Sequence, residues 1–197
     1  MDEKIKEIRN TSYDVTVTEG EESRKVEGYA LLFDVKSDGL DIEEVIERGS
    51  LDGVIEKSNV FALLNHDDRR GILARSKNGQ GTLTLSVDTK GLKYSFDAPK
   101  TVLGDELLEY IRRGEISESS FAFTVAEDVW EKKDDETWKR TIKKFYQLYD
   151  VSPVYDAAYS KTSVSMRGKE QVEKELRKKE TETELTEYYS NILKSIN

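Results

Sequence analysis

The sequence predicts an α+β fold that is mainly β, followed by a charged C-terminal tail. Over roughly the first two-thirds of the chain, short segments alternate apolar and polar residues and are separated by turn residues, as strands of a half-buried sheet are. One amphipathic helical pattern interrupts these segments, and the end of the chain is strongly charged. We therefore expect residues 1–167 to form one domain and residues 168–197 to form a helical or disordered tail that is open to cleavage.

Strands dominate the N-terminal half of the expected domain. Alternation predicts a strand at 13–17, and a run that becomes continuously apolar predicts a central strand at 26–33. Residues 42–57 are typical of a loop followed by a short helix, with Ser50 as its N-cap. Further strands, bounded by turn signals, are predicted at 60–64, 71–75, 82–87 and 93–97.

An amphipathic helix follows these strands and ends at Gly114. Its apolar positions are Leu103, Leu107, Leu108 and Ile111. Residues 119–126 then indicate a strand, and residues 137–149 alternate well enough for one or two more beyond a hairpin tip at 134–136. Residues 150–159 are expected to close the core.

The C-terminal tail carries a stripe of apolar residues at helical spacing. Its members are Leu185, Tyr188, Tyr189, Ile192, Leu193 and Ile196. Such a stripe is expected to dock on a partner or on the chain's own domain.

Composition excludes several classes of function. The net charge is −9, which argues against a nonspecific polyanion binder, and the absence of cysteine excludes disulfides and thiolate metal sites. A single histidine excludes a multi-histidine zinc site within one chain. No signal peptide is recognisable, and no segment reaches the about 20 apolar residues that span a bilayer. We expect a soluble cytoplasmic protein with no cofactor, no metal, no nucleic acid and no membrane partner.

His66 and Ser120 are the chemically informative pair. Histidine is the side chain that exchanges a proton near neutrality, and a serine hydroxyl becomes a good nucleophile when such a base accepts its proton. If Phe121 and Phe123 point into the core, alternation places Ser120 on the opposite face, with room for a substrate carbonyl beside Ala122.

The run that contains His66 is expected to place it at the mouth of a strand. In that strand Ala62, Leu64 and His66 would share one face, so that the imidazole meets the serine there. Sequence separation does not prevent this contact, because catalytic triads occur in several chain orders.

Five motifs follow one another between Val26 and Met166. They are Glu27-Gly28-Tyr29-Ala30 with Phe33, Asn65-His66-Asp67, Gly91-Leu92, Ser120-Phe121-Ala122-Phe123, and Val151-Ser152-Pro153-Val154 with Ala157-Ala158-Tyr159. In this order and spacing they resemble the tailed-bacteriophage prohead (procapsid) maturation proteases, serine peptidases similar in fold to the herpesvirus assemblins. We therefore expect a small, distorted antiparallel β-barrel flanked by a few helices.

The resemblance implies roles for individual residues. His66 corresponds to the general base and Ser120 to the nucleophile, while Ser119 is the neighbouring candidate on the face of Phe121. Herpesvirus-type enzymes use a second histidine, which this chain lacks, so the third member is a carboxylate or absent. Asp150 is our choice by position. The alternatives that stay open are Asp67, Asp68, Asp88 and Asp156.

Two positions depart from the family's pattern. The family often has glycine two residues after the nucleophile, where this chain has Ala122, and a glycine common in the Ile72–Arg75 motif is Ala74 here. Neither departure removes a reacting group. An oxyanion hole is also required, and backbone amides near Ser120 are the candidates.

The resemblance further implies a serine endopeptidase that matures a phage procapsid. Its expected substrates are the scaffolding segment of the major capsid protein and the protease itself, cleaved inside the assembling procapsid in the host-cell cytoplasm. Self-cleavage is expected between Gly168 and Glu187, where the chain is highly charged. Relatives often dimerise or act within a larger assembly, so homo-oligomerisation is an open expectation.

Three other interpretations compete with this one. A non-enzymatic procapsid assembly or scaffold module would act through the C-terminal apolar stripe. A generic serine esterase is disfavoured in its common form, because no Gly-x-Ser-x-Gly elbow is present. A metal site at Asn65-His66-Asp67-Asp68 is also disfavoured, because carboxylates often occur beside one histidine by chance.

Overall fold

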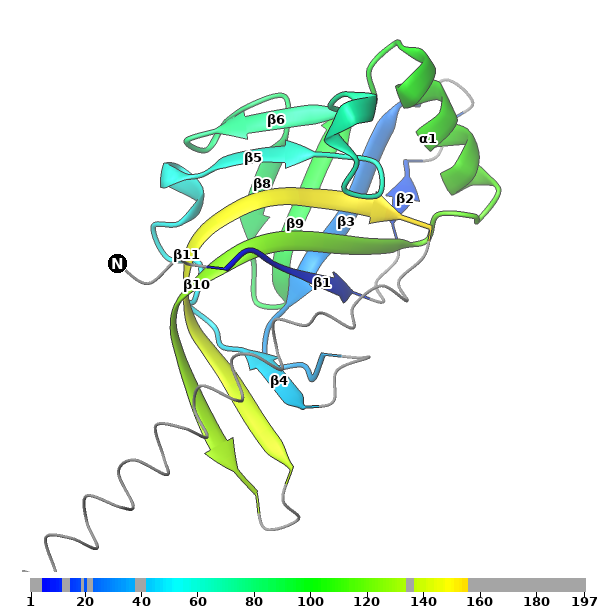
Figure 1. Ribbon diagram of the computed structural model, residues 1–197. Coiled ribbons are helices and arrows are strands. Elements are labelled where there is room, and N and C mark those ends of the chain that lie inside the picture. Colours follow the sequence, from blue (N-terminus) through cyan, green and yellow to red (C-terminus); the bar gives the residue numbers. More distant parts are fainter. Residues whose placement is uncertain are drawn as a thin grey trace, which may run out of the picture. The chain divides into compact units, whose positions relative to one another are not determined.

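A computed structural model describes residues 5–11, 15–18, 20, 23–37, 42–133 and 137–155. All of these residues belong to residues 1–162, the first of two units into which the chain divides. They form two β-sheets and one α-helix (Figure 1). The predicted tail at 168–197, its apolar stripe and the boundary at 167 lie outside the described residues. The α+β, mainly β fold class is confirmed.

The first sheet has seven strands and is built around a long antiparallel hairpin. The strand order is β1-β10-β11-β5-β6-β7, and β4 also pairs with β11. The bounds are β1 Glu7–Thr11, β4 Glu43–Ile46, β5 Asn59–Ala62, β6 Ala74–Lys77, β7 Gln80–Gly81, β10 Glu118–Lys132 and β11 Trp138–Val154. Strand β11 runs parallel to β5 near its C-terminal end and parallel to β4 near its N-terminal end.

The second sheet has four strands in the order β2-β3-β9-β8. Its bounds are β2 Thr16–Val17, β3 Lys25–Leu32, β8 Thr84–Val87 and β9 Gly91–Asp97. The helix α1 spans Val102–Arg112, and short 3₁₀ turns occur at η1 Ile55–Lys57 and η2 Asp68–Arg70. Thr101 caps α1 by accepting a hydrogen bond from the amide of Gly104 at 3.3 Å.

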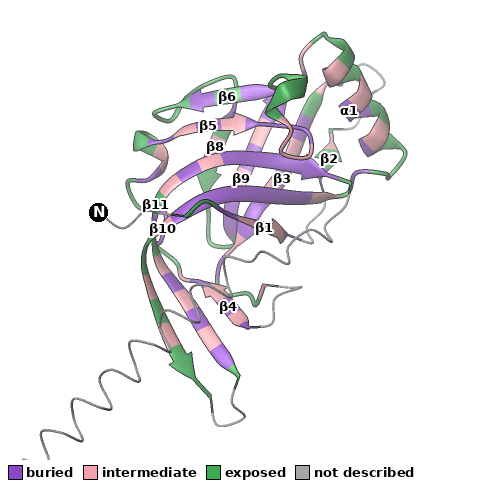
Figure 2. Ribbon diagram, in the orientation of Figure 1, coloured by how far each residue is buried: buried purple, intermediate pink, exposed green. Residues whose placement is uncertain are grey.

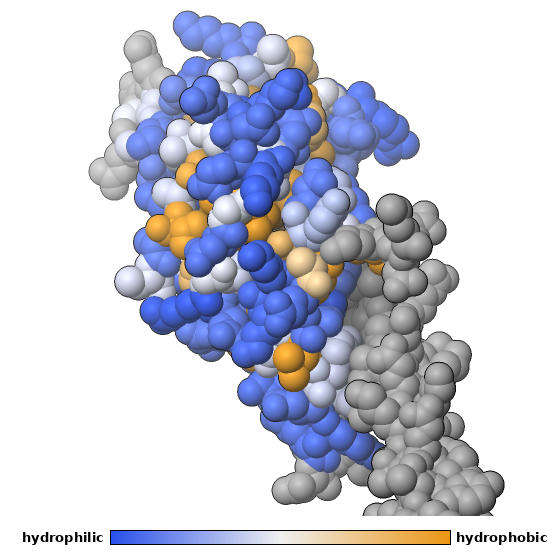
Figure 3. Space-filling model, turned by 90° about the vertical axis from the view of Figure 1, so that its left-hand side faces the viewer, coloured by the Kyte–Doolittle hydropathy of each residue, from blue (hydrophilic) through white to orange (hydrophobic). Residues whose placement is uncertain are grey.

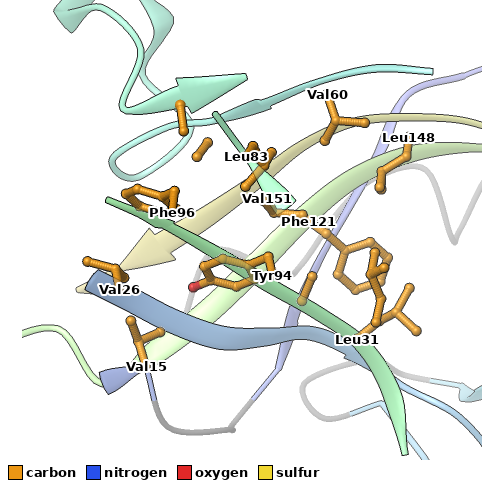
Figure 4. Close-up of a cluster of buried hydrophobic side chains, with 14 of the residues drawn as sticks. Val15, Val26, Leu31, Val60, Leu83, Tyr94, Phe96, Phe121, Leu148 and Val151 are labelled. Atoms are coloured by element: carbon orange, nitrogen blue, oxygen red, sulfur yellow. The ribbon is translucent and has the colours of Figure 1, made fainter. Parts of the chain in front are cut away.

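Aromatic residues from both sheets fill the core between them. Phe121 and Phe123 of β10 stack with ring centroids 5.0 Å apart, and Phe145 of β11 packs edge-on against Phe123 at 4.8 Å. Tyr94 of β9 lies among the labelled core side chains in Figure 4. In Figure 2 the buried stretches of β10 and β11 lie in the body of the domain, whereas at the far end of this hairpin β10 is exposed or half-buried and β11 alternates buried and half-buried residues. Apolar burial therefore anchors one half of the hairpin.

Gly28 makes room for the ring of Tyr94, its cross-strand partner on β9. A Cβ atom at Gly28 would lie 2.7 Å from the Tyr94 hydroxyl and 2.8 Å from ring atom Cζ. The hydroxyl in turn lies 2.9 Å from Ser119 Oγ on β10. Gly28 thus allows the tyrosine to join the two sheets directly beneath the strand that carries Ser120.

A buried network of ion pairs joins β1, β4 and β11. Arg9 donates to both oxygens of Glu44, at 2.6 and 2.9 Å, and to Glu7 at 2.6 Å. Arg140 donates to Glu7 at 2.7 and 2.9 Å and to Glu44 at 2.9 Å. All four side chains are at most 7% exposed. Because each charge has several partners, burial does not leave an uncompensated ion.

The structure bears on three sequence-based predictions about the fold: the closed barrel is not confirmed, the short helix at 42–57 is wrong, and the strand at 137–149 is confirmed. The described strands form two sheets, and no closed barrel is present among them. The segment 42–57 contains β4 and a 3₁₀ turn in place of the short helix, and Ser50 is buried without a capping role. The segment 137–149, predicted to hold one or two strands, belongs to one continuous strand, β11, which runs from Trp138 to Val154.

The face in Figure 3 is mostly hydrophilic, with small and separate apolar patches. Within the described ranges, no helix has the length and apolar content needed to cross a membrane.

Candidate active site

The register of β10 against β11 places the predicted site residues on one face of the sheet. Ser120 lies opposite Ser152, and Ala122 lies opposite Asp150. Side chains alternate along a strand, so all four share the face that points away from Phe121 and the core. Ser119 is on the core side, where it bonds Tyr94. The prediction that Ser120 and Ser119 lie on opposite faces of the strand agrees with this arrangement.

His66 reaches this face through a left-handed turn. Strand β5 ends at Ala62, and the chain stays close to β11 through a hydrogen bond from the amide of Asn65 to the carbonyl of Pro153 at 3.0 Å. Asn65 and His66 then have φ values of 54° and 59°, a conformation in which asparagine and histidine are enriched. Ala62 and Leu64 belong to the core, so the expectation that they share a strand face with His66 is wrong.

The imidazole of His66 lies between Ser120 and Asp150. Its Nε2 is 2.6 Å from Ser120 Oγ, and its Nδ1 is 2.5 Å from Asp150 Oδ1. A serine, a histidine and a carboxylate in this order provide a path for a proton from the hydroxyl to the imidazole, with the carboxylate fixing the ring.

Two residues of the edge strand β1 region also contact the site. The carbonyl oxygen of Arg9 accepts a hydrogen bond from Ser120 Oγ at 2.9 Å. Lys6 Nζ lies 3.4 Å from Asp150 Oδ2. The hydroxyl of Ser120 has one hydrogen, so the Arg9 carbonyl competes with His66 as its acceptor. The N-terminal segment therefore touches both ends of the hydrogen-bonded chain.

The surroundings of Asp150 favour its ionised form. Burial raises the pKa of Asp150, but the hydrogen bond and charge of His66, the charge of Lys6 and the hydrogen bond from Ser152 together outweigh burial and hold the pKa below its ordinary value. A carboxylate at this position can accept a hydrogen bond from Nδ1–H and stabilise an imidazolium ion.

The site is mostly enclosed. Ser120, Ser152 and Ala122 have no exposed surface and Asp150 is 2% exposed, whereas the side chain of His66 is 19% exposed. The predicted room beside Ala122 is therefore not open in this structure. A pocket of about 310 Å³ lies beside Asp150, lined among others by Lys6, Phe61, Leu63 and Tyr149.

The other candidate carboxylates lie elsewhere. Asp67 binds Arg69 at 2.9 Å and caps η2, in which Asp68 is the first residue. Asp88 accepts a hydrogen bond from Tyr29 at 2.6 Å in an exposed turn. Asp156 is outside the described residues. In the part of the chain that the structure describes, no three metal-ligating side chains gather as a metal site would require.

Three contacts to these residues were missed by sequence reasoning: Ser152, Lys6 and the carbonyl of Arg9. Ser152 had a signal, because it lies two residues after Asp150 and thus on the same strand face. The sequence of strand β1 gave no such signal, because its buried positions Glu7 and Arg9 are charged.

Comparison with known proteins decides the family. The family model described as Caudovirus prohead serine protease matches residues 11–177. The chain belongs to this family. It is therefore a serine peptidase of the procapsid, and the predicted resemblance is confirmed.

Among solved structures, that of the bacteriophage T4 capsid assembly protease, gp21, is similar to this chain. It is 14% identical, and the match covers 79% of this chain and 99% of that chain with a TM-score of 0.48. No curated protein matches the chain.

Proposed function

We propose that this protein is a serine endopeptidase in which Ser120 is the nucleophile, His66 the general base and Asp150 the residue that orients His66. The hydrogen-bonded chain from Ser120 through His66 to Asp150 is the observation that supports this assignment most directly. Family membership supports the reaction class, and these contacts support the role that we propose for each residue.

The reaction follows from the positions of the protons. Ser120 Oγ attacks the carbonyl carbon of the scissile peptide bond while its proton passes to His66 Nε2. The resulting imidazolium returns this proton to the leaving amine, the C–N bond breaks, and an acyl-enzyme remains. Water then attacks the acyl-enzyme with His66 again as base, which releases the new carboxylate and restores the Ser120 hydroxyl. Asp150 keeps Nδ1 protonated throughout.

The substrates we propose are the scaffolding segment of the major capsid protein and the protease itself. The family description supports a role in the prohead, and we propose that cleavage takes place inside the assembling shell in the host cell. Self-cleavage between residues 168 and 187 stays a prediction, since that segment lies outside the described residues.

Labelling with a fluorophosphonate tests the assignment without knowledge of the cleavage site. Ser120 Oγ would bond to phosphorus, fluoride would leave, and His66 would accept the proton. We expect mass spectrometry to locate the adduct on Ser120, and Ser120→Ala and His66→Ala to abolish it.

Ser119→Ala is the matched control, because Ser119 is adjacent but faces Tyr94. Absence of an adduct, or an adduct that survives in Ser120→Ala, contradicts the assignment.

Co-expression with the major capsid protein of the same phage tests the proposed substrates. The wild-type chain should shorten both proteins within assembled particles. Ser120→Ala should give particles of full-length proteins, whereas Ser119→Ala should process them. Full processing by Ser120→Ala would rule out the proposed function.

A further inference from the structure

We infer that Ser152 is a positioning residue of the active site, which fixes the carboxylate of Asp150 in the orientation that binds His66. The inference rests on the proposed function and deepens it. It concerns a residue that touches neither the scissile bond nor the hydroxyl of Ser120, and that acts through Asp150.

The contacts of the Ser152 hydroxyl define its role as a donor. Its Oγ lies 2.9 Å from Asp150 Oδ1 and 3.2 Å from His66 Nδ1. When Nδ1 carries its proton toward Asp150, that nitrogen has no lone pair to offer, so the hydroxyl hydrogen goes to the carboxylate. Oδ1 then accepts two hydrogen bonds, one from His66 and one from Ser152.

A second donor is needed because one hydrogen bond does not fix a carboxylate. The terminal torsion of an aspartate is broad, so a single contact with His66 leaves the carboxylate plane free to rotate. Asp150 is 2% exposed, so water does not satisfy its remaining capacity as it would at the surface. Ser152 supplies that fixed donor from the same strand.

Lys6 is a weaker restraint on the same carboxylate. Its ammonium group lies 3.4 Å from Oδ2 and its side chain is 52% exposed. A long, half-exposed side chain at this distance contributes little that is directional. The buried hydroxyl of Ser152 is therefore the contact that sets the geometry.

The sheet ties Ser152 to the nucleophile as well. Ser152 is the direct cross-strand partner of Ser120, and Asp150 is the partner of Ala122. Directly paired residues have Cβ atoms about 5 Å apart, so backbone pairing sets the distance between nucleophile and restraint. Ser152, Asp150 and Ser120 thus form one rigid unit, against which His66 docks from its turn.

The fluorophosphonate reaction provides the first test, through its maximal rate constant and the reagent concentration at half-maximal rate. In Ser152→Ala we expect the maximal rate constant to fall about tenfold, the equivalent of one ordinary hydrogen bond, with the half-maximal concentration unchanged. Ser152→Cys keeps a similar shape with a weak donor and should be intermediate. Ser76→Ala is the matched control, because Ser76 is buried in β6 and its hydroxyl has no hydrogen-bond partner among the described residues.

Proton NMR provides a test that does not depend on activity. His66 is the only histidine, so the downfield resonance of its Nδ1 proton has one assignment. Ser152→Ala should move this resonance upfield or broaden it, and Ser76→Ala should leave it unchanged. If Ser152→Ala does not fold, Ser152→Cys carries both tests.

The outcomes separate this inference from the proposed function. If the wild-type protein does not react with the fluorophosphonate, the proposed catalytic roles are contradicted. The Nδ1 resonance alone then decides whether Ser152 orders the His66–Asp150 pair. Normal labelling together with an unchanged resonance in Ser152→Ala and Ser152→Cys overturns the inference, while the proposed function stands. A changed half-maximal concentration with a normal maximal rate constant also overturns it.

Discussion

Ser120 and Ser152 lie directly opposite each other on β10 and β11, with Ala122 and Asp150 as the next pair on the same face. A slip of one residue in this register would turn either Ser120 or Asp150 into the core. The long hairpin is therefore the element that assembles the site, and the core residues that hold its register contribute indirectly to the chemistry.

Replacing Asp150 with asparagine should reduce catalysis far more than it changes structure. An amide at this position favours the imidazole tautomer with Nδ1 unprotonated, so His66 can no longer accept the proton of Ser120, and rate losses of roughly a thousandfold or more are typical. The maximal rate constant of fluorophosphonate labelling measures this loss. Asp88→Asn, in an exposed turn, is the control and should label at the wild-type rate. Normal labelling of Asp150→Asn would remove Asp150 from the triad.

Gly28→Ala should destabilise the fold by overpacking. The new Cβ would lie 2.7 Å from the Tyr94 hydroxyl and 2.8 Å from Cζ, and a buried ring has little freedom to move. We expect a loss of about 1–3 kcal/mol in the free energy of unfolding, measured by urea denaturation.

A second substitution tests the cause of this loss. Tyr94→Phe removes the closest clashing atom, so the double variant Gly28→Ala/Tyr94→Phe should lose less than the sum of the two single variants. Simple additivity of the two losses would show that Gly28 matters for another reason than contact with Tyr94.

Glu44→Ala should be among the most destabilising substitutions on β4. It removes one of the two buried carboxylates that Arg9 and Arg140 share, and breaking such a network typically costs about 3–5 kcal/mol. Glu43, the preceding residue, is the matched control, because it pairs with Lys133 at the surface. Glu43→Ala should change the urea midpoint much less, since exposed ion pairs contribute little. An equal loss of stability in Glu44→Ala and Glu43→Ala would contradict the proposed contribution of the buried network to stability.

Acid should weaken the fold through the same network. Burial raises the pKa of Glu7, but hydrogen bonds and charges from Arg140 and Arg9 outweigh burial and hold the pKa below its ordinary value near 4.5. A carboxyl whose folded pKa is depressed stabilises the fold fully above its unfolded pKa and loses that contribution as pH falls through the folded pKa. The pKa of Asp150 is also held below its ordinary value, so its contribution to stability is likewise lost as the pH falls.

Urea midpoints at a series of pH values measure this effect. Stability from Glu7 should be constant above about pH 5 and decline steadily below about pH 4.5. Glu7→Gln should be less stable than wild type near neutrality and show a shallower acid decline. A decline of the same steepness in Glu7→Gln would assign acid sensitivity to other groups.

Hydrophobic alternation was sufficient for β10, because Phe121 and Phe123 occupy its inner positions and Ser120 the outer one. It failed for β1 and β4, where the buried positions include Glu7, Arg9 and Glu44. Charged residues on the inner face reverse the pattern that predicts a strand, and only the pairing of distant charges makes their burial favourable. No single segment of sequence contains that information.

The position of His66 shows a similar limit. Its contact with Ser120 depends on two successive residues in the left-handed region, Asn65 and His66, at the end of a short strand. Alternation has no means of predicting such a turn, so it assigned the histidine to the wrong face. The triad was assigned from motif order, and its geometry came from a turn and a strand register that the motifs do not describe.

The family match begins at residue 11, where β1 ends. A recombinant fragment cut at that boundary would lack Lys6 and Arg9, and with them a carbonyl against the Ser120 hydroxyl, an ammonium group near Asp150 and half of the buried ion-pair network. Sequence similarity thus delimits a shorter segment than the one that builds the proposed active site, and expression designs should retain the amino-terminal strand.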